Sequence, residues 1–187
     1  MTGRHVLRVG AVAVAAASLL AAGTANAKTP TFAAYIVDAA GKSIGEAHFV
    51  SVAKGVQVTV NVSGLPPGVH GMHVHEFGSC NTLRDTTGAP TVFGAAGGHY
   101  DPGTTGHHRG PDGGGHAGDM PTITVDPMGN GGVTFFDKDL QIGGGSSIVG
   151  RAIVIHANGD NFTDTPPNGG AGGRIACGEI GAAHAAS

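Results

Sequence analysis

The sequence contains little positive charge. Only 10 of its 187 residues are Lys or Arg, whereas 13 are Asp or Glu and 11 are His. Domains that bind nucleic acid typically carry a basic face or stripe. Since no such patch is present, the charge pattern does not indicate a nucleic-acid partner.

Long hydrophobic runs are also scarce. The one strongly apolar stretch lies near the amino terminus and stops at Ala22, which is short for the ~20 residues that a membrane span needs. Two arginines precede it and Ala-Asn-Ala follows at residues 25–27, a pattern typical of a secretory signal peptide. We therefore expect a signal peptide at 1–27, one mature domain at 28–187, and export to the periplasm or the extracellular side. A membrane anchor is the alternative, but we expect none that is stable.

Cysteine is limited to Cys80 and Cys177. In an exported chain such a pair favours a disulfide over two free thiols. The bond would close a loop of nearly one hundred residues, which the chain-entropy model values at about 4–5 kcal/mol.

No segment has a convincing helical period. In residues 56–63, by contrast, four valines alternate with polar residues, which is the period-two pattern of a half-buried strand. Short strands are predicted at 32–39, 44–53, 56–63, 71–76, 121–126, 133–139, 151–157 and 175–180. Several short strands separated by Gly, Pro and Asp turns indicate an all-β sandwich or barrel.

Two segments do not fit a strand, namely residues 77–118 and 158–173. Both are rich in glycine and too long to be ordinary connections in a compact domain unless they are functional. Because such chain cannot order itself by apolar burial, a disulfide and metal ions are the candidates for holding it.

The stretch HGMHVHE, residues 70–76, suggests a metal site. Residues two apart share one face of a strand, so His73 and His75 point the same way, whereas His70 points to the other side if the strand is regular there. Further histidines and Asp119 lie in the glycine-rich segments and at the end of a later strand. Four histidines in a tetragonal arrangement suit Cu(II), and three histidines with one aspartate suit a closed zinc site.

Five motifs carry a family resemblance: GVHGMHVHEFGSC, GGHYDP, HRGPDGGGHAGDMP, GRAIVIHANGD and GGRIACGEIG. In this order and spacing they resemble the copper/zinc superoxide dismutases, particularly the exported bacterial type, over residues 32–181. The resemblance implies a Greek-key, eight-stranded flattened barrel with a zinc loop and an electrostatic loop. It also implies one Cu and one Zn per subunit, superoxide as the substrate, and a monomer or a homodimer.

Matched residue by residue, the resemblance implies a complete site. The copper ligands would be His73, His75, His99 and His156, and the zinc ligands would be His99, His108, His116 and Asp119, with His99 bridging the two ions. Asp160 would bond the outer nitrogens of His73 and His108, and Arg174 would bind the anion beside copper. His70 would have a structural role behind the site, and Cys80–Cys177 would be the family disulfide. The catalytic residues would thus be Arg174 and His99.

The remaining histidines are less informative. His107 is an alternative to His108, but the spacing of His108 to the following Gly-Pro fits the motif better. Nothing in the sequence assigns chemistry to His48 or His184.

One feature departs from the expected charge pattern. Between His156 and Cys177 the sequence contains Asp160 and Asp164, no lysine, and Arg174 as its only cation. Steering of an anionic substrate depends on positive charge near the channel, which Arg109 or Lys138 would have to supply. We expect a slower and less salt-sensitive enzyme than a relative with lysines there.

Three rival functions are weaker. A module that only binds copper does not need Arg174, and a copper-only enzyme does not need the zinc set. A purely structural sandwich does not need this number of histidines. The sequence therefore favours a superoxide dismutase, an oxidoreductase.

Overall fold

The protein is described from a computed structural model, which covers Met1 and residues 31–183. The alternating segment forms strand β3 (Gly55–Ser63), in which Val56, Val58, Val60 and Val62 are buried. The residues between them are exposed or partly exposed. The period-two pattern thus places one face of this strand in the core, as predicted.

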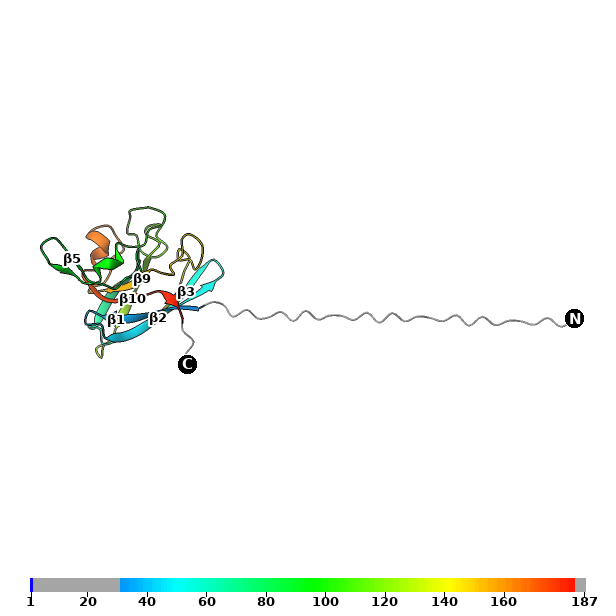
Figure 1. Cartoon of the computed structure of the whole chain (residues 1–187), viewed down its shortest axis with the longest axis horizontal. Coiled ribbons are helices and arrows are strands. Elements are labelled where there is room, and N and C mark those ends of the chain that lie inside the picture. Colours follow the sequence, from blue (N-terminus) through cyan, green and yellow to red (C-terminus); the bar gives the residue numbers. More distant parts are fainter. Residues whose placement is uncertain (2–30, 184–187) are drawn as a thin grey trace.

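Eight strands form a closed antiparallel barrel (Figure 1). They are β1 (Thr31–Asp38), β2 (Ser43–Val52), β3, β4 (Gly68–His75), β7 (Asp119–Val125), β8 (Asn130–Asp137), β9 (Ala152–His156) and β10 (Arg174–Glu179). Their order is β10-β9-β4-β7-β8-β3-β2-β1, and β1 pairs again with β10, Val37 opposite Cys177, to close the sheet. All eight predicted strands are confirmed to within a few residues at each end.

The connections are of Greek-key type. Strand β3 lies between β2 and β8, so the chain crosses the barrel end to reach β4, and it crosses again between β8 and β9. As a result β4 and β9, which are far apart in sequence, are direct neighbours, with Met72 opposite Ile155. This pairing brings histidines from two distant segments together.

Five short elements were not predicted. They are the two-residue strands β5 (Leu83–Arg84), β6 (Pro90–Thr91) and β11 (Gly181–Ala182), and the 3₁₀ helices η1 (Gly94–Ala96) and η2 (Pro167–Gly170). Strands β5 and β6 form a separate hairpin, and β11 extends the sheet beside β1. No helix in the described part of the chain is long and apolar enough to cross a membrane.

The barrel contains the main apolar core. Fully buried side chains from most of its strands meet there, including Ile36, Phe49, Met72, Ile123 and Ile153. The two long loops, one from β4 to β7 and one from β9 to β10, lie on the same side of the barrel in Figure 1, where η1 (green) and η2 (orange) can be seen. The polar site lies between these loops and the barrel.

Candidate metal centre

Four buried histidines converge at one point on the barrel. His73 and His75 come from β4, His156 ends β9, and His99 belongs to the loop that follows β4. One ring nitrogen from each lies within 4.8 Å of the corresponding atom of every other. The neighbouring strands β4 and β9 hold three of the rings. An isolated antiparallel β-bridge between the backbones of His75 and His99 brings the loop histidine, His99, to the other three.

Each of the three strand histidines bonds an oxygen atom through only one of its two ring nitrogens. The bonds run from His73 Nε2 to Asp160 Oδ2 at 2.7 Å, from His75 Nδ1 to the Gly97 carbonyl at 3.0 Å, and from His156 Nδ1 to the Gly172 carbonyl at 3.0 Å. An outer N–H bond of this kind fixes the tautomer and leaves the inner lone pair available to a metal ion. His75 Nε2 and His156 Nε2 accordingly face each other at 3.4 Å.

A second set converges on Asp119, the first residue of β7. Its Oδ1 lies 2.9 Å from Nδ1 of His108, 3.1 Å from Nδ1 of His99 and 3.4 Å from Nδ1 of His116. Ligand atoms of His73, His99, His108 and Asp119 all lie within 4.8 Å of one another. His116 is outside this group, although its Nδ1 faces Asp119. His73 falls in both groups because its ring stacks on that of His99, with the centroids 3.8 Å apart.

The buried nitrogens fit metal binding better than hydrogen bonding. Two of them, His73 Nδ1 and His99 Nε2, have no hydrogen-bond partner in the described chain, while His108 Nδ1 and His116 Nδ1 face the carboxylate of Asp119. Buried polar atoms are rarely left without partners, because each carries an uncompensated desolvation cost. Imidazole and carboxylate donors suit zinc and copper, so both ions fit these residues.

His99 joins the two sets. It is a member of the four-histidine group, and its Nδ1 faces Asp119 Oδ1 of the second set. Its buried Nε2 has no hydrogen-bond partner in the described part of the chain.

Asp160 lies behind both sets. It accepts from His73 Nε2 at 2.7 Å and from His108 Nε2 at 2.8 Å, so one carboxylate orients a ring in each group. These two bonds lower the pKa of Asp160 against the opposing effect of burial, and the carboxylate stays ionised.

Burial keeps the four-histidine group neutral. It lowers the pKa of His73 to about 3 and that of His156 to about 4, and it also lowers the pKa of His75 and His99. Burial disfavours the charged imidazolium, and the neighbouring histidines add to the effect. Neutral imidazole is the form that binds one metal ion, so His73, His75 and His156 need not lose a proton at neutral pH.

His108 behaves differently in the metal-free chain. Burial again opposes its protonation, but the carboxylates of Asp119 and Asp160 outweigh burial and raise the pKa of His108 to about 9. The Asp119–His108 pair is thus an ion pair until a cation replaces the proton.

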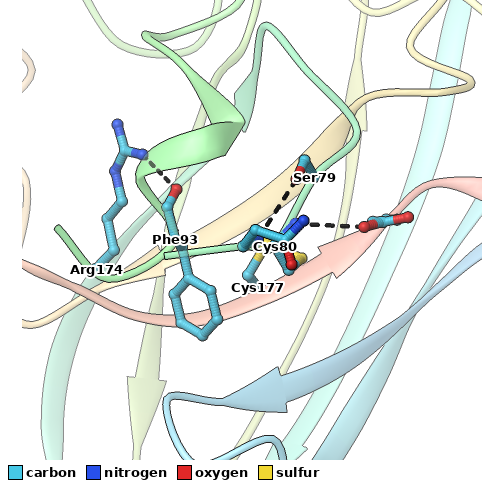
Figure 2. Close-up of a disulfide and its surroundings, with 7 residues drawn as sticks. Ser79, Cys80, Phe93, Arg174 and Cys177 are labelled. Carbon is cyan, nitrogen blue, oxygen red and sulfur yellow. Dashed lines mark hydrogen bonds between the residues drawn. A yellow bond between two sulfur atoms is a disulfide. The ribbon is translucent and has the colours of Figure 1, made fainter. Parts of the chain in front are cut away.

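Arg174, the first residue of β10, is held beside the four-histidine group. It is opposite His156 in the β9–β10 pairing, and its charge helps, after burial, to lower the pKa of His75 and His156. Its guanidinium donates to the Phe93 carbonyl at 2.6 Å, a bond that Figure 2 draws, and also to the Gly97 carbonyl. These two backbone acceptors fix the guanidinium in one direction.

The disulfide lies close to this arginine, as Figure 2 shows. Cys80 and Cys177 are bonded across 97 residues of sequence, so the predicted disulfide is present. It ties the beginning of the first long loop to β10, and a small apolar cluster of Phe93, Ala96 and Val154 packs beside Cys177. The segment that orients Arg174 is thereby anchored to the barrel.

The other sequence-predicted histidines lie outside both groups. His70 is buried, and its two ring nitrogens lie 2.8 Å from the carbonyl oxygens of His156 and Pro66, so it packs against the backbone behind the site. His107 pairs with Asp164 at the surface, and His48 pairs with Glu46. His184 and residues 2–27 of the expected signal peptide lie outside the described residues.

Sequence reasoning missed several partners of the site. The carbonyls of Gly97 and Gly172 orient His75 and His156, but a backbone oxygen leaves no mark in the sequence. Asp164 accepts from the backbone N–H of His108, whereas the sequence alone marks Asp164 only as a negative charge in the loop. Lys138, a candidate for steering, is paired with Asp112 at 2.8 Å and Asp139 at 3.0 Å.

A closed antiparallel barrel with two adjoining sets of buried histidine and aspartate donors defines a β-barrel protein with a two-metal centre. Comparison with known proteins narrows this class. Residues 43–180 match the sequence model of the family described as copper/zinc superoxide dismutase. The chain therefore belongs to the copper/zinc superoxide dismutase family.

Individual relatives agree. The chain is 44% identical to a Cu-Zn superoxide dismutase of Deinococcus radiodurans over 80% of its own length and 83% of the relative's. It is 39% identical to that of Escherichia coli K12, over 75% and 80%. The solved structure of the Brucella abortus Cu/Zn superoxide dismutase is similar with a TM-score of 0.73 and 37% identity, covering 80% of this chain and 99% of that one.

Proposed function

We propose that this chain removes superoxide at a centre in which His73, His75, His99 and His156 bind copper. His99, His108, His116 and Asp119 bind zinc in the same centre. The observation that supports this most strongly is the position of His99, which belongs to both donor sets, bonds Asp119 through Nδ1 and leaves a buried Nε2 without a hydrogen-bond partner in the described chain. The reaction converts two superoxide anions and two protons into oxygen and hydrogen peroxide.

The ions and the protein have separate tasks. When bound, copper would supply the one-electron exchange, and zinc would add to the ordering of the loop that contains His108. Arg174 attracts the anion and orients it, because a fixed cation stabilises the charge that develops on the reduced oxygen species. Its bonds to two carbonyls support this assignment, since they keep the guanidinium in place before substrate arrives.

His99 is the residue we assign to proton transfer. Its Nε2 has no hydrogen-bond partner in the described chain, and the ring is held through the bond of Nδ1 to Asp119. A proton held at Nε2 can therefore be passed to the product without the ring turning. Asp160 keeps His73 and His108 oriented while this occurs.

The proposed setting is extracytoplasmic. A signal peptide at 1–27, a mature domain at 28–187 and an intact disulfide are together consistent with export to the periplasm or the extracellular side. We propose a monomer or homodimer without a stable membrane anchor.

The experiment is metal analysis of the purified mature protein combined with a superoxide-removal assay with and without copper. We expect about one copper and one zinc per chain, and activity that is lost on copper removal and restored on its return. A fully copper-loaded protein without activity would instead indicate a copper-binding module. The Arg174→Ala variant is compared with the parent in the same assays, and we expect it to bind both metals and to lose most of the activity.

A further inference from the structure

Every second residue of the segment 160–164 contacts the loop that contains His108. Asp160 bonds the His108 ring, Phe162 packs against Gly110, and Asp164 lies against His107 and His108. A Cβ atom at Gly110 would come within 2.6 Å of the Phe162 ring, so the Phe162 side chain packs in space that only a glycine at position 110 leaves open. This contact fixes the separation of the two loops.

Asp164 makes two bonds of different kinds. Its Oδ1 accepts from the backbone N–H of His108 at 2.7 Å, and its Oδ2 lies 3.0 Å from Nδ1 of His107. The pair with His107 is exposed, with both side chains 52% accessible, and exposed pairs of this kind contribute little. The bond to the buried residue His108 is therefore the important one.

Carboxylates also hold the next backbone amides. The N–H groups of Arg109 and Gly110 donate to Asp119 Oδ2 at 3.2 and 3.3 Å. The backbone at residues 108–110 therefore depends on two carboxylates, one from each side. Of these two carboxylates, Asp119 belongs to β7 and Asp164 to the loop between β9 and β10.

The loop that presents Asp164 is itself hydrogen-bonded. Asn161 Oδ1 accepts from the backbone N–H and the hydroxyl of Thr163 at 2.9 and 2.7 Å. Backbone bonds also join Asn161 N–H to the Gly169 carbonyl and Gly169 N–H to the Thr163 carbonyl, both at 3.0 Å. Asp164 therefore reaches His108 from a closed loop rather than from a free chain.

We propose that Asp164 is a positioning residue for the zinc half of the centre. It holds the backbone of His108 while Asp160 holds the outer nitrogen of the same ring. Two fixed points direct His108 Nδ1 toward Asp119. This proposal rests on the proposed function, because it requires that His108 bind zinc.

The test measures zinc affinity of the metal-free full chain by competition with a chromophoric chelator. Removing an outer partner of a metal ligand typically weakens metal binding about 10- to 100-fold, and we expect a loss in this range for Asp164→Ala. Asp164→Asn keeps an oxygen acceptor for the His108 N–H, so we expect it to stay within about 3-fold of the parent. His107→Ala removes only the exposed pair and should also stay within that limit.

A spectroscopic measurement separates positioning from general destabilisation. With Co²⁺ in place of zinc, Asp164→Ala should change the visible absorption of the bound ion, whereas Asp164→Asn and His107→Ala should preserve the parent spectrum. Unchanged affinity and spectrum in Asp164→Ala would overturn the proposal. An Asp164→Asn variant as weak as Asp164→Ala would do so too, because the acceptor oxygen would then not be the cause.

His108→Ala tells the two proposals apart. If it binds zinc as tightly as the parent, the zinc assignment itself is wrong. If it loses zinc while Asp164→Ala does not, only the positioning role is wrong.

Discussion

The barrel and the two loops that cover its metal centre are stabilised in different ways. The barrel buries aliphatic and aromatic side chains such as Phe49 and Ile153 in one continuous core. Where the loops meet the barrel, the buried residues include His99 and His108, which are held by the carboxylates of Asp119 and Asp160. Patterned strands can fold by apolar burial alone, whereas glycine-rich loops cannot.

This difference has a consequence for function. Metal binding to a site that is absent in the unfolded chain adds to the folding free energy. The barrel therefore provides a rigid frame, while the ions and the disulfide complete the loops that shape the active centre. Variants of the metal ligands should mainly affect activity, whereas variants of the scaffold and of the disulfide should mainly affect stability.

The largest expected effect is on activity. His75→Ala removes a proposed copper ligand, so copper-dependent superoxide removal should fall by at least about 100-fold, the upper range for loss of an outer partner alone. The barrel should remain folded by circular dichroism. His48→Ala, on β2 at the surface, is the control and should retain full activity.

His70→Ala tests the role of a buried histidine that lies outside the two metal-ligand sets. It removes a buried side chain that bonds two carbonyls, so the free energy of unfolding should fall by about 1–3 kcal/mol. Residual activity near that of the parent is expected at temperatures where the variant stays folded. Activity as low as that of His75→Ala, with copper still bound, would contradict the separation of roles.

The disulfide is expected to have the largest effect on stability. Replacing both cysteines by serine releases a cross-link across 97 residues, and the free energy of unfolding should fall by about 4–5 kcal/mol in the chain-entropy model. Denaturant titration measures this, with the reduced parent as control. A loss below about 1 kcal/mol in both would show that the loop is anchored by other contacts.

The free energy of unfolding of the metal-free protein should depend on pH. His73 and His156 have pKa values of about 3 and 4 when folded but near 6.5 when unfolded, so the unfolded chain binds more protons between these limits. Their contribution to stability therefore falls as pH drops below about 6.5, by up to about 1.4 kcal/mol for each unit of pKa difference. The contribution of His108, whose folded pKa is about 9, is present below 6.5 and is lost as pH rises through 9.

Urea unfolding of the metal-free chain between pH 4 and pH 9 should thus give a maximum near neutral pH. A stability that increases steadily from pH 6.5 to pH 4 would contradict the burial of neutral histidines.

The smallest expected effect concerns salt. The loop between β9 and β10 contains Asp160 and Asp164 without lysine, and Lys138 is neutralised by two carboxylates. Steered enzymes gain 10-fold or more from attractive fields, so a weak field should give less than about 3-fold slowing between low and physiological salt. A steep decrease in rate with ionic strength would show that other cations, such as Arg109, steer the substrate.

The sequence predicted these two regions unequally. The alternation at Val56–Val62 located β3, and the other seven barrel strands were located as short segments between Gly, Pro and Asp turns. The hairpin of β5 and β6 has only two residues in each strand, too few to show a period. The donor residues of the site were found through motifs, whereas its backbone partners at Gly97 and Gly172 depend on loop conformation that no local pattern specifies.

Amide hydrogen exchange with and without bound metal tests the central claim most directly. We predict that removing copper and zinc strongly lowers protection in residues 99–118 and 157–173, while protection in β2, β3 and β9 changes little. Equal protection of these loops in the metal-free and metal-loaded protein would contradict the account, because the loops would then be ordered without the ions.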